Sequence, residues 1–300
     1  MSLTRRELLC AAGALPFVCG AAAPKVPLGF SLYGMKSVAL PEALKVCRTV
    51  GYDGVELALM PGYHAEPKAV SANDRKELRA RLADLGLSVH GLMENLQEPA
   101  ADPAHKANLE RLKAATELAH SLAPDAPPPI ETVLGGKPAE WDKVRAQLAE
   151  RLGAWAELGQ STRTVIAVKP HVANALHTVE GAVWLMKQVN SPWLRLAFDY
   201  SHFELRGVPL ERTRALLPYT AFVHVKDAKG KPEKFEFLLP GEGATDYSAL
   251  AKLLTTAKYA GPVVVEVSGQ VSNKPGYDAA SAAKRSFAAI GAAFARDLKK

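Results

Sequence analysis

Short apolar runs without turn residues alternate with longer amphipathic segments along most of the chain. An uninterrupted apolar run is typical of a strand that is buried on both faces, as in parallel α/β sheets. Strands are predicted over residues 28–33, 54–59, 87–93, 130–134, 164–168, 194–198, 221–223 and 262–265. The amphipathic segments predict helices over residues 40–50, 71–86, 103–122, 138–158, 178–189, 209–217, 246–259 and 278–298.

This order of strands and helices predicts parallel strands joined by right-handed crossovers. The number of strand and helix units suits an α/β fold of the closed (β/α)8 TIM barrel type, with residues 24–300 as a single domain. The alternative is a doubly wound open sheet, which usually has a glycine-rich phosphate turn after its first strand. Residues 31–36 read Ser-Leu-Tyr-Gly-Met-Lys at that place, so the closed barrel is preferred.

The first residues read as an export signal and not as part of the fold. Arg5 and Arg6 precede an apolar segment, residues 8–23, that is too short and too interrupted by glycine and proline for a good membrane span. Residues 1–23 thus resemble a twin-arginine signal peptide, with the three alanines 21–23 suited to a signal peptidase. We expect a periplasmic or secreted protein without stable membrane association after cleavage. The alternative is a frayed, slightly apolar N-terminus.

Composition and net charge limit the classes of molecule that the protein is expected to bind. Of 300 residues, 48% are hydrophobic and 23% charged, which indicates a soluble protein with a large core. Without the leader, Cys47 is the one cysteine left, so no intrachain disulfide is expected. The formal net charge falls from +6 to +5, without clusters of lysine or arginine. Nucleic acid is therefore not an expected partner, whereas a small neutral or anionic substrate is.

Polar side chains end the last four predicted strands: Lys169, Asp199, His224 and Glu266. The carboxyl ends of barrel strands converge on one mouth, where such folds keep their chemistry. Aspartate, histidine and glutamate together offer oxygen and nitrogen ligands suited to Mn²⁺, Mg²⁺, Co²⁺ or Zn²⁺. His202, three positions after Asp199, would bind substrate or a second ion.

These residues lie in a series of short motifs: Asp199-x-x-His202, His224-Val225-Lys226-Asp227, Gly241-Glu242-Gly243 with Asp246-Tyr247, and Val263-Val264-Val265-Glu266. The series resembles the sugar phosphate isomerase and epimerase superfamily with xylose isomerase-like TIM barrels, the AP endonuclease family 2-like proteins. The resemblance covers residues 29–294 and is clearest from residue 164 onward. That superfamily also contains inosose dehydratases and the endonuclease IV branch.

The resemblance implies that Asp199, His224 and Glu266 are ligands of one divalent ion and that Glu266 also carries protons. The family's fourth ligand is a glutamate at the end of strand five, where this chain has Lys169. A protonated lysine has no lone pair for a metal. Lys169 would be a neutral base or ligand, a positive charge that makes the site independent of metal, or a Schiff-base nucleophile. His171 is an alternative replacement for the lost ligand.

The predicted function is that of a sugar or polyol isomerase or epimerase, or of a related enzyme that eliminates water, with Lys169 and Glu266 as catalytic residues. The predicted substrate-binding residues are His171, His202, Lys226 and Glu242. Glu56, His90 and Glu94, near the ends of earlier strands, are assigned structural roles. The alternatives are a barrel that binds a sugar without catalysis and a Schiff-base lyase that uses Lys169. Cleavage of abasic DNA is not expected, because no Asp-x-His follows strand seven.

Overall fold

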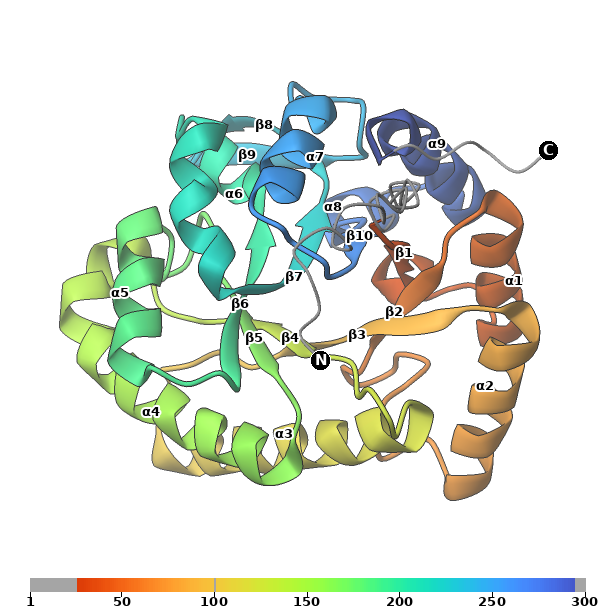
Figure 1. Ribbon diagram of the computed structural model, residues 1–300, viewed down its shortest axis with the longest axis horizontal. Coiled ribbons are helices and arrows are strands. Elements are labelled where there is room, and N and C mark those ends of the chain that lie inside the picture. Colours follow the sequence, from red (N-terminus) through yellow and green to blue (C-terminus); the bar gives the residue numbers. More distant parts are fainter. Residues whose placement is uncertain (1–25, 100, 295–300) are drawn as a thin grey trace, which may run out of the picture.

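The computed structural model describes residues 26–99 and 101–294. Parallel strands close into a barrel in the order β1-β10-β7-β6-β5-β4-β3-β2, with helices around it (Figure 1). The barrel strands are β1 (Leu28–Ser31), β2 (Gly54–Ala58), β3 (Ser88–Asn95), β4 (Ile130–Val133), β5 (Ile166–Lys169), β6 (Leu194–Asp199), β7 (Thr220–Val225) and β10 (Val263–Val265). The predicted closed barrel is confirmed. The predicted signal peptide, residues 1–23, lies outside the described residues.

The α-helices are α1 (Leu40–Val50), α2 (Ala72–Leu85), α3 (Asp102–Leu122), α4 (Trp141–Thr162), α5 (Val179–Val189), α6 (Tyr200–Glu204), α7 (Tyr247–Thr256), α8 (Gly269–Ser272) and α9 (Ala279–Gly291). Shorter 3-10 segments are η1 (Leu32–Met35), η2 (Pro138–Glu140), η3 (Leu210–Tyr219) and η4 (Ala292–Phe294). Among the described helices, none is both long and apolar enough to cross a membrane.

Local sequence signals explain several of these boundaries. The Ser71 hydroxyl accepts a hydrogen bond from the Asp74 amide, and the Asp74 carboxylate accepts one from the Ser71 amide, which is a capping box at the start of α2. Gly86 ends α2 in the left-handed conformation, with φ of 60°. The predicted start and end of this helix are therefore confirmed.

Several predicted elements differ from the structure, among them three where the chain takes 3-10 geometry. The first strand ends at Ser31, not at residue 33, because the Ser31 hydroxyl accepts a hydrogen bond from the Tyr33 amide and starts a 3-10 turn. The segment predicted as a helix over residues 209–217 is the 3-10 segment η3, and Pro218 lies inside it. Proline lacks the amide hydrogen that an α-helix needs at that position. The last α-helix ends at Gly291, and the 3-10 segment η4 follows it directly.

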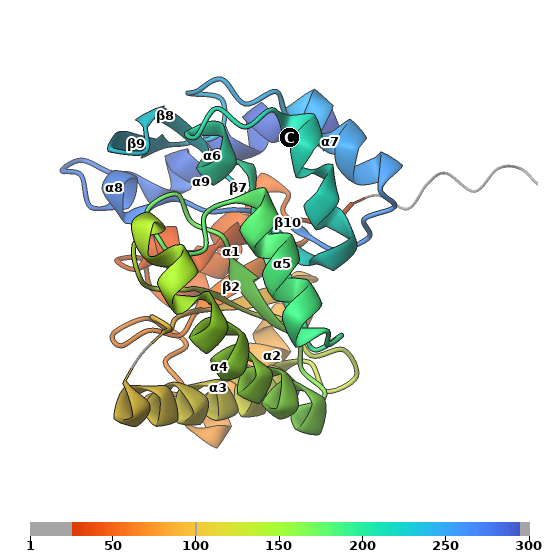
Figure 2. The same ribbon diagram turned by 90° about the vertical axis from the view of Figure 1, so that its left-hand side faces the viewer.

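A hairpin that the sequence pattern did not predict follows β7. Strands β8 (Asp227–Lys231) and β9 (Lys234–Leu238) pair antiparallel, outside the barrel, and lie beside α6 in Figures 1 and 2. β8 is polar apart from Ala228 and Gly230, whereas β9 alternates, with Phe235 and Phe237 on either side of Glu236. The hairpin begins directly after Lys226, so it extends from the mouth of the barrel.

The inside of the barrel holds a small apolar layer separate from the main core. Ala167, Ala197, Phe222 and Val264 form this layer, one residue from each of β5, β6, β7 and β10. Phe222 fills space that Gly91 leaves open, since a Cβ at Gly91 would lie 2.7 Å from the Phe222 ring. Neighbouring residues on these strands face outward to the helices. The barrel interior is thus packed beneath its mouth.

Candidate active site

Four polar side chains form a second layer above the apolar one. Lys169, Asp199, His224 and Glu266 each stand two positions after a member of the apolar layer. Because successive side chains of a strand point to opposite faces, residues two apart share a face. The predicted convergence of these four residues is therefore what the structure shows. Lys169, Asp199 and His224 are at most 3% exposed, and Glu266 is partly exposed at the mouth.

The ammonium of Lys169 lies among three acceptors. Its Nζ is 2.9 Å from His224 Nδ1, 2.9 Å from Glu266 Oε2 and 3.1 Å from Glu131 Oε1. Burial lowers the pKa of Lys169, but the charges of Glu131 and Glu266 outweigh burial, so that the pKa is raised. Lys169 is therefore a charged group held by ion pairs.

The hydrogen position on His224 follows from this contact. Burial lowers the pKa of His224, but the charge of Glu56 outweighs burial and raises the pKa to about 9. The contact with Lys169 nevertheless decides the hydrogen position at Nδ1: a protonated Nδ1 would place two donors 2.9 Å apart, so we assign Nδ1 as an acceptor from Lys169. The remaining ring hydrogen is then on Nε2, which lies 3.0 Å from Glu56 Oε2 and donates to it.

A second ammonium holds the other side of the cluster. Lys226 Nζ donates to Asp199 Oδ2, to Glu266 Oε2 at 2.7 Å, and weakly to His202 Nε2 at 3.5 Å. It also lies 4.7 Å from the centre of the Phe237 ring, which β9 places over it. The other oxygen of Asp199 accepts from the amide and the hydroxyl of Ser201. The ammonium of Lys226 and both carboxylate oxygens of Asp199 thus have partners.

Glu266 differs from the other acids because its two oxygens are unequal. Oε2 accepts from Lys169 and Lys226, at 2.9 and 2.7 Å, and His224 Nδ1 lies 3.2 Å from it. Within the described residues, Oε1 has no hydrogen bond, and the side chain is 12% exposed. Burial raises the pKa of Glu266, but Lys169 and Lys226 outweigh it and hold the pKa well below its usual range. Glu266 is a fixed carboxylate with one oxygen free of hydrogen bonds within the described residues.

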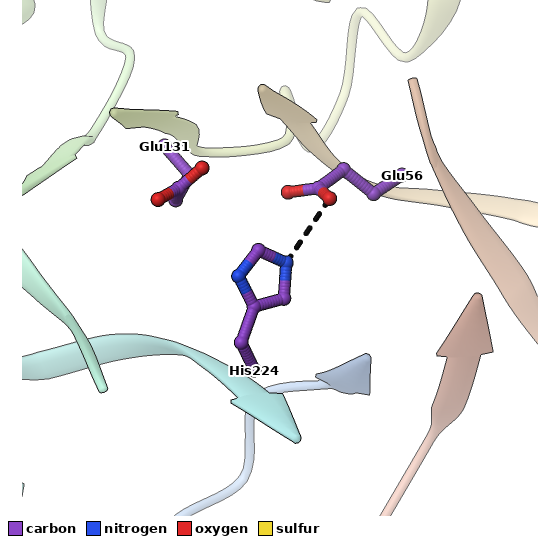
Figure 3. Close-up of side chains that lie close together, drawn as sticks. All are labelled: Glu56, Glu131 and His224. Carbon is purple, nitrogen blue, oxygen red and sulfur yellow. Dashed lines mark hydrogen bonds and ion pairs between the residues drawn. The ribbon is translucent and has the colours of Figure 1, made fainter. Parts of the chain in front are cut away.

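Two further acids, Glu56 and Glu131, lie next to His224 inside the barrel. Figure 3 shows the carboxylates of Glu56 and Glu131 turned toward each other above the His224 ring. Glu56 and His224 are 0% exposed and Glu131 is 1% exposed. Glu56 Oε1 has no hydrogen-bond partner among the described residues. Burial raises the pKa of Glu131, which Lys169 opposes.

The sequence pattern does not predict these two acids at the site. Glu131 lies within a predicted strand, and Glu56 is expected to have a structural role. The available signal was an acid inside an otherwise apolar strand, as in Ile130-Glu131-Thr132-Val133. Since burial of an acid without a partner is costly, such a position indicates a buried charge network.

Two histidines and a phenylalanine cover the cluster. The rings of His171 and His202 are 4.2 Å apart, and Phe237 approaches His202 at 5.1 Å between centroids. Burial lowers the pKa of His202 well below its usual range and that of His171 to about 4, so both rings are neutral at pH 7. These residues thus lie where substrate-binding side chains were predicted, although the role itself stays a prediction.

Glu242 lies apart from this cluster. Its carboxylate pairs with Arg285 and accepts from the Leu239 amide. Asp227 instead anchors the loop: its Oδ2 accepts from the amides of Gly241 and Gly243, at 2.8 and 2.7 Å. The structure therefore brings together the predicted site residues except Glu242.

Most of the chain matches a known protein family. Residues 44–289 match the family described as xylose isomerase-like TIM barrel. The chain belongs to that family. An uncharacterised protein of Mycobacterium leprae is 27% identical over 271 residues, which is 82% of this chain and 90% of that protein. An inosose dehydratase of Clostridium botulinum is 27% identical over 135 residues, 40% of this chain and 45% of the enzyme.

Solved structures show the same fold at low identity. The IolI protein with a bound zinc atom has a TM-score of 0.74 at 18% identity, covering 89% of this chain and 98% of that one. The 3-keto-D-glucoside 4-epimerase of E. coli has a TM-score of 0.70 at 17% identity, covering 89% of this chain and 99% of the epimerase.

Two sets of buried side chains have the composition of a metal site: Asp199 with His224 and Glu266, and Glu56 with Glu131 and His224. In each set the candidate ligand atoms lie within 4.8 Å of one another. In the first set, however, Lys169 or Lys226 is hydrogen-bonded to all three members. In the second set, His224 Nε2 is directed at Glu56. With the lysines in place, Asp199, His224 and Glu266 do not fit a divalent ion. These contacts disfavour the predicted metal role of the three residues, which stays a prediction.

Proposed function

We propose that this protein is an enzyme that moves a proton on a carbon next to the carbonyl of a sugar or polyol. Isomerisation, epimerisation and elimination of water all begin with this step. The family supports the proposal, since an epimerase and an inosose dehydratase are among the similar proteins. The geometry supports it through one residue, Glu266.

The observation that carries the proposal is the unequal use of the Glu266 oxygens. Two ammonium groups donate to Oε2, so the carboxylate cannot rotate freely, whereas Oε1 has no hydrogen bond within the described residues and the side chain is 12% exposed. A positioned carboxylate oxygen is suited to accept a proton from a substrate carbon. We assign Glu266 Oε1 as the proton acceptor.

The two ammonium groups would favour this transfer. When the substrate C–H bond breaks, the proton goes to Glu266 Oε1 and the electron pair moves onto the carbonyl oxygen, giving an enolate. The negative charge leaves Glu266 and appears on the substrate, so Lys169 and Lys226 lose one anionic partner and gain another. Fixed positive charges close to a developing oxyanion stabilise it more than water does. Return of the proton to the same or the neighbouring carbon completes the reaction.

The contacts of Lys169 distinguish the three roles considered for it. Its raised pKa keeps the amine protonated, and its partners occupy its donors. A protonated amine has no lone pair with which to attack a carbonyl or take a proton. The role as a fixed positive charge is favoured over the neutral base and the Schiff base.

A second candidate, a barrel that binds a sugar without catalysis, is favoured by the completeness of the ion pairs. Lys169, Lys226 and Asp199 already have partners inside the protein. We further propose that the twin-arginine segment directs export, which favours a free or oxidised sugar over a phosphorylated one.

Deuterium uptake from D2O, followed by proton NMR, tests the proposal without knowledge of the product. The substrates to screen are ketohexoses, keto-inositols and 3-keto-glucosides. We expect uptake at one carbon next to the carbonyl with the wild type, and at least a hundredfold slower uptake with Glu266→Gln. Glu211→Gln is the matched control, because Glu211 is an exposed residue that pairs with Arg214.

The outcomes separate the two candidates. Uptake by Glu266→Gln at the wild-type rate would exclude Glu266 as the proton acceptor. Binding of a keto sugar by the wild type in calorimetry, without any uptake, would favour the binding protein. Circular dichroism of each variant establishes that the fold is retained.

A further inference from the structure

The charged cluster contains a cation that belongs to the chain itself. Asp199, His224 and Glu266 bring three candidate ligand atoms within 4.8 Å of one another, which is a spacing suited to one metal ion. Lys169 Nζ lies 2.9 Å from an atom of His224 and 2.9 Å from an atom of Glu266. A cation therefore already stands between two members of this set.

Asp199, the third member of the set, is paired with a second ammonium, that of Lys226. Lys226 Nζ donates to Asp199 Oδ2 and to the same Glu266 oxygen that receives Lys169. The two ammonium groups together contact every member of the set. An ion that bound all three residues would have to displace both lysines.

The barrel interior holds Lys169 in this place. Glu131 Oε1 forms an ion pair with it at 3.1 Å, and the hydrogen bond from His224 Nε2 to Glu56 leaves Nδ1 as an acceptor. The ammonium donates hydrogen bonds to His224 and Glu266, and Glu131 is its third partner, through charge. All of these groups except Glu266 are at most 3% exposed.

We propose that Lys169 is the resident cation of this site and takes the place of a divalent ion. The Asp199, His224 and Glu266 side chains then serve as its counter-charges and not as metal ligands, and Glu56 and Glu131 are positioning residues that orient its partners. The proposal deepens the function proposed above, but metal binding, and not catalysis, tests it.

The substitution Lys169→Glu provides the test, because it removes the ammonium and adds a carboxylate at the same strand end. Protein freed of metal with a chelator is titrated with Mn²⁺, and bound ion is followed by electron paramagnetic resonance. Zn²⁺ is measured in the same way against a colorimetric chelator. We expect no tight binding by the wild type and at least a hundredfold higher affinity in Lys169→Glu, at about one ion per chain.

Two further variants complete the design. Lys187→Glu makes the same change of charge at an exposed position on α5 and should gain no affinity. Lys169→Met removes the ammonium without adding a ligand, so it should bind an ion more weakly than Lys169→Glu and more tightly than the wild type. It replaces Lys169→Glu in the test if that variant does not fold.

Each outcome decides the proposal. A tight ion in the wild type that is lost in Asp199→Asn overturns it, since the ligand set would then be active beside Lys169. A tight ion that is lost in Glu56→Gln also overturns it, because metal on His224 Nε2 would move the ring hydrogen to Nδ1, against Lys169. Folded Lys169→Glu and Lys169→Met proteins that gain no metal overturn it as well. The metal titration does not depend on catalysis, so it tests this proposal even if no deuterium uptake is found.

Discussion

Lys169 and Glu266 are 97 positions apart in the chain, at the ends of strands that are not neighbours in the barrel, and their charged atoms lie 2.9 Å apart. Closure of the barrel brings them together, because β5 and β10 point their inward residues toward a common axis. The ion pair thus depends on the correct register of the strands between them. Local structure alone could not form it.

The second ammonium is expected to contribute to stability as well as to charge. Lys226→Met leaves Asp199 buried without its ammonium, and loss of one partner of a buried pair costs about 3–5 kcal/mol. The free energy of unfolding, measured with urea, should fall by that amount. Lys187→Met, at an exposed position, is the control and should change it by less than about 0.5 kcal/mol. Equal stability of the two variants would contradict the role given to the ion pair.

Asp227 is expected to hold the loop around residues 241–243. Its carboxylate accepts from the Gly241 and Gly243 amides and from the Tyr247 hydroxyl at 2.7 Å. Asp227→Ala removes all three acceptors, and hydrogen bonds to a charged group contribute about 1.5–3 kcal/mol each. Hydrogen exchange at the two glycine amides should accelerate at least tenfold. Asp227→Asn keeps one acceptor oxygen and should show a smaller acceleration, whereas unchanged protection in both variants would disprove the anchor.

The packing inside the barrel predicts a specific clash. Gly91→Ala would place a methyl group 2.7 Å from the Phe222 ring, and overpacking of this kind costs about 1–3 kcal/mol. Phe222→Leu in the same chain should recover part of that loss, since it removes the contacting atoms. Gly153→Ala is the control, because that helical position has open space around it. Its stability should rise by about 0.5–1 kcal/mol. Absence of coupling between residues 91 and 222 would exclude the clash as the cause.

His90 predicts a pH dependence of stability. It is buried against Gly29 and Gly54, and burial lowers its pKa to about 4, against the opposing charge of Asp53. The unfolded chain, with a pKa near 6.5, binds more protons than the folded protein between pH 4 and 6.5. The contribution of His90 to the free energy of unfolding is therefore fully present above pH 6.5 and is lost as the pH is lowered toward 4. The contribution is about 3 kcal/mol.

The variant His90→Gln isolates this effect, because its amide does not titrate. Urea unfolding of both proteins at several pH values from 4 to 7 should give a steeper curve for the wild type. Parallel curves would show that His90 does not cause the dependence.

Sequence periodicity predicted much of the fold and part of the site. The apolar runs identified the barrel strands, and the placement of Lys169, Asp199, His224 and Glu266 two positions after the inward apolar residues followed from strand alternation. The hairpin was not predicted because β8 is polar and β9 alternates polar and apolar residues, whereas the strands were identified from uninterrupted apolar runs. Phe237, which this hairpin places over Lys226, was therefore not expected at the site.

What the sequence determined by itself is the set of barrel strands and the polar residues at the ends of the last four, since both depend on the local pattern along the chain. The partners of Lys169 were decided only by the tertiary structure. His224, Glu266 and Glu131 come from β7, the end of β10 and β4, and their distances depend on barrel closure and strand register. The sequence left three roles open for Lys169, because the charge of a buried amine depends on which acids surround it in space.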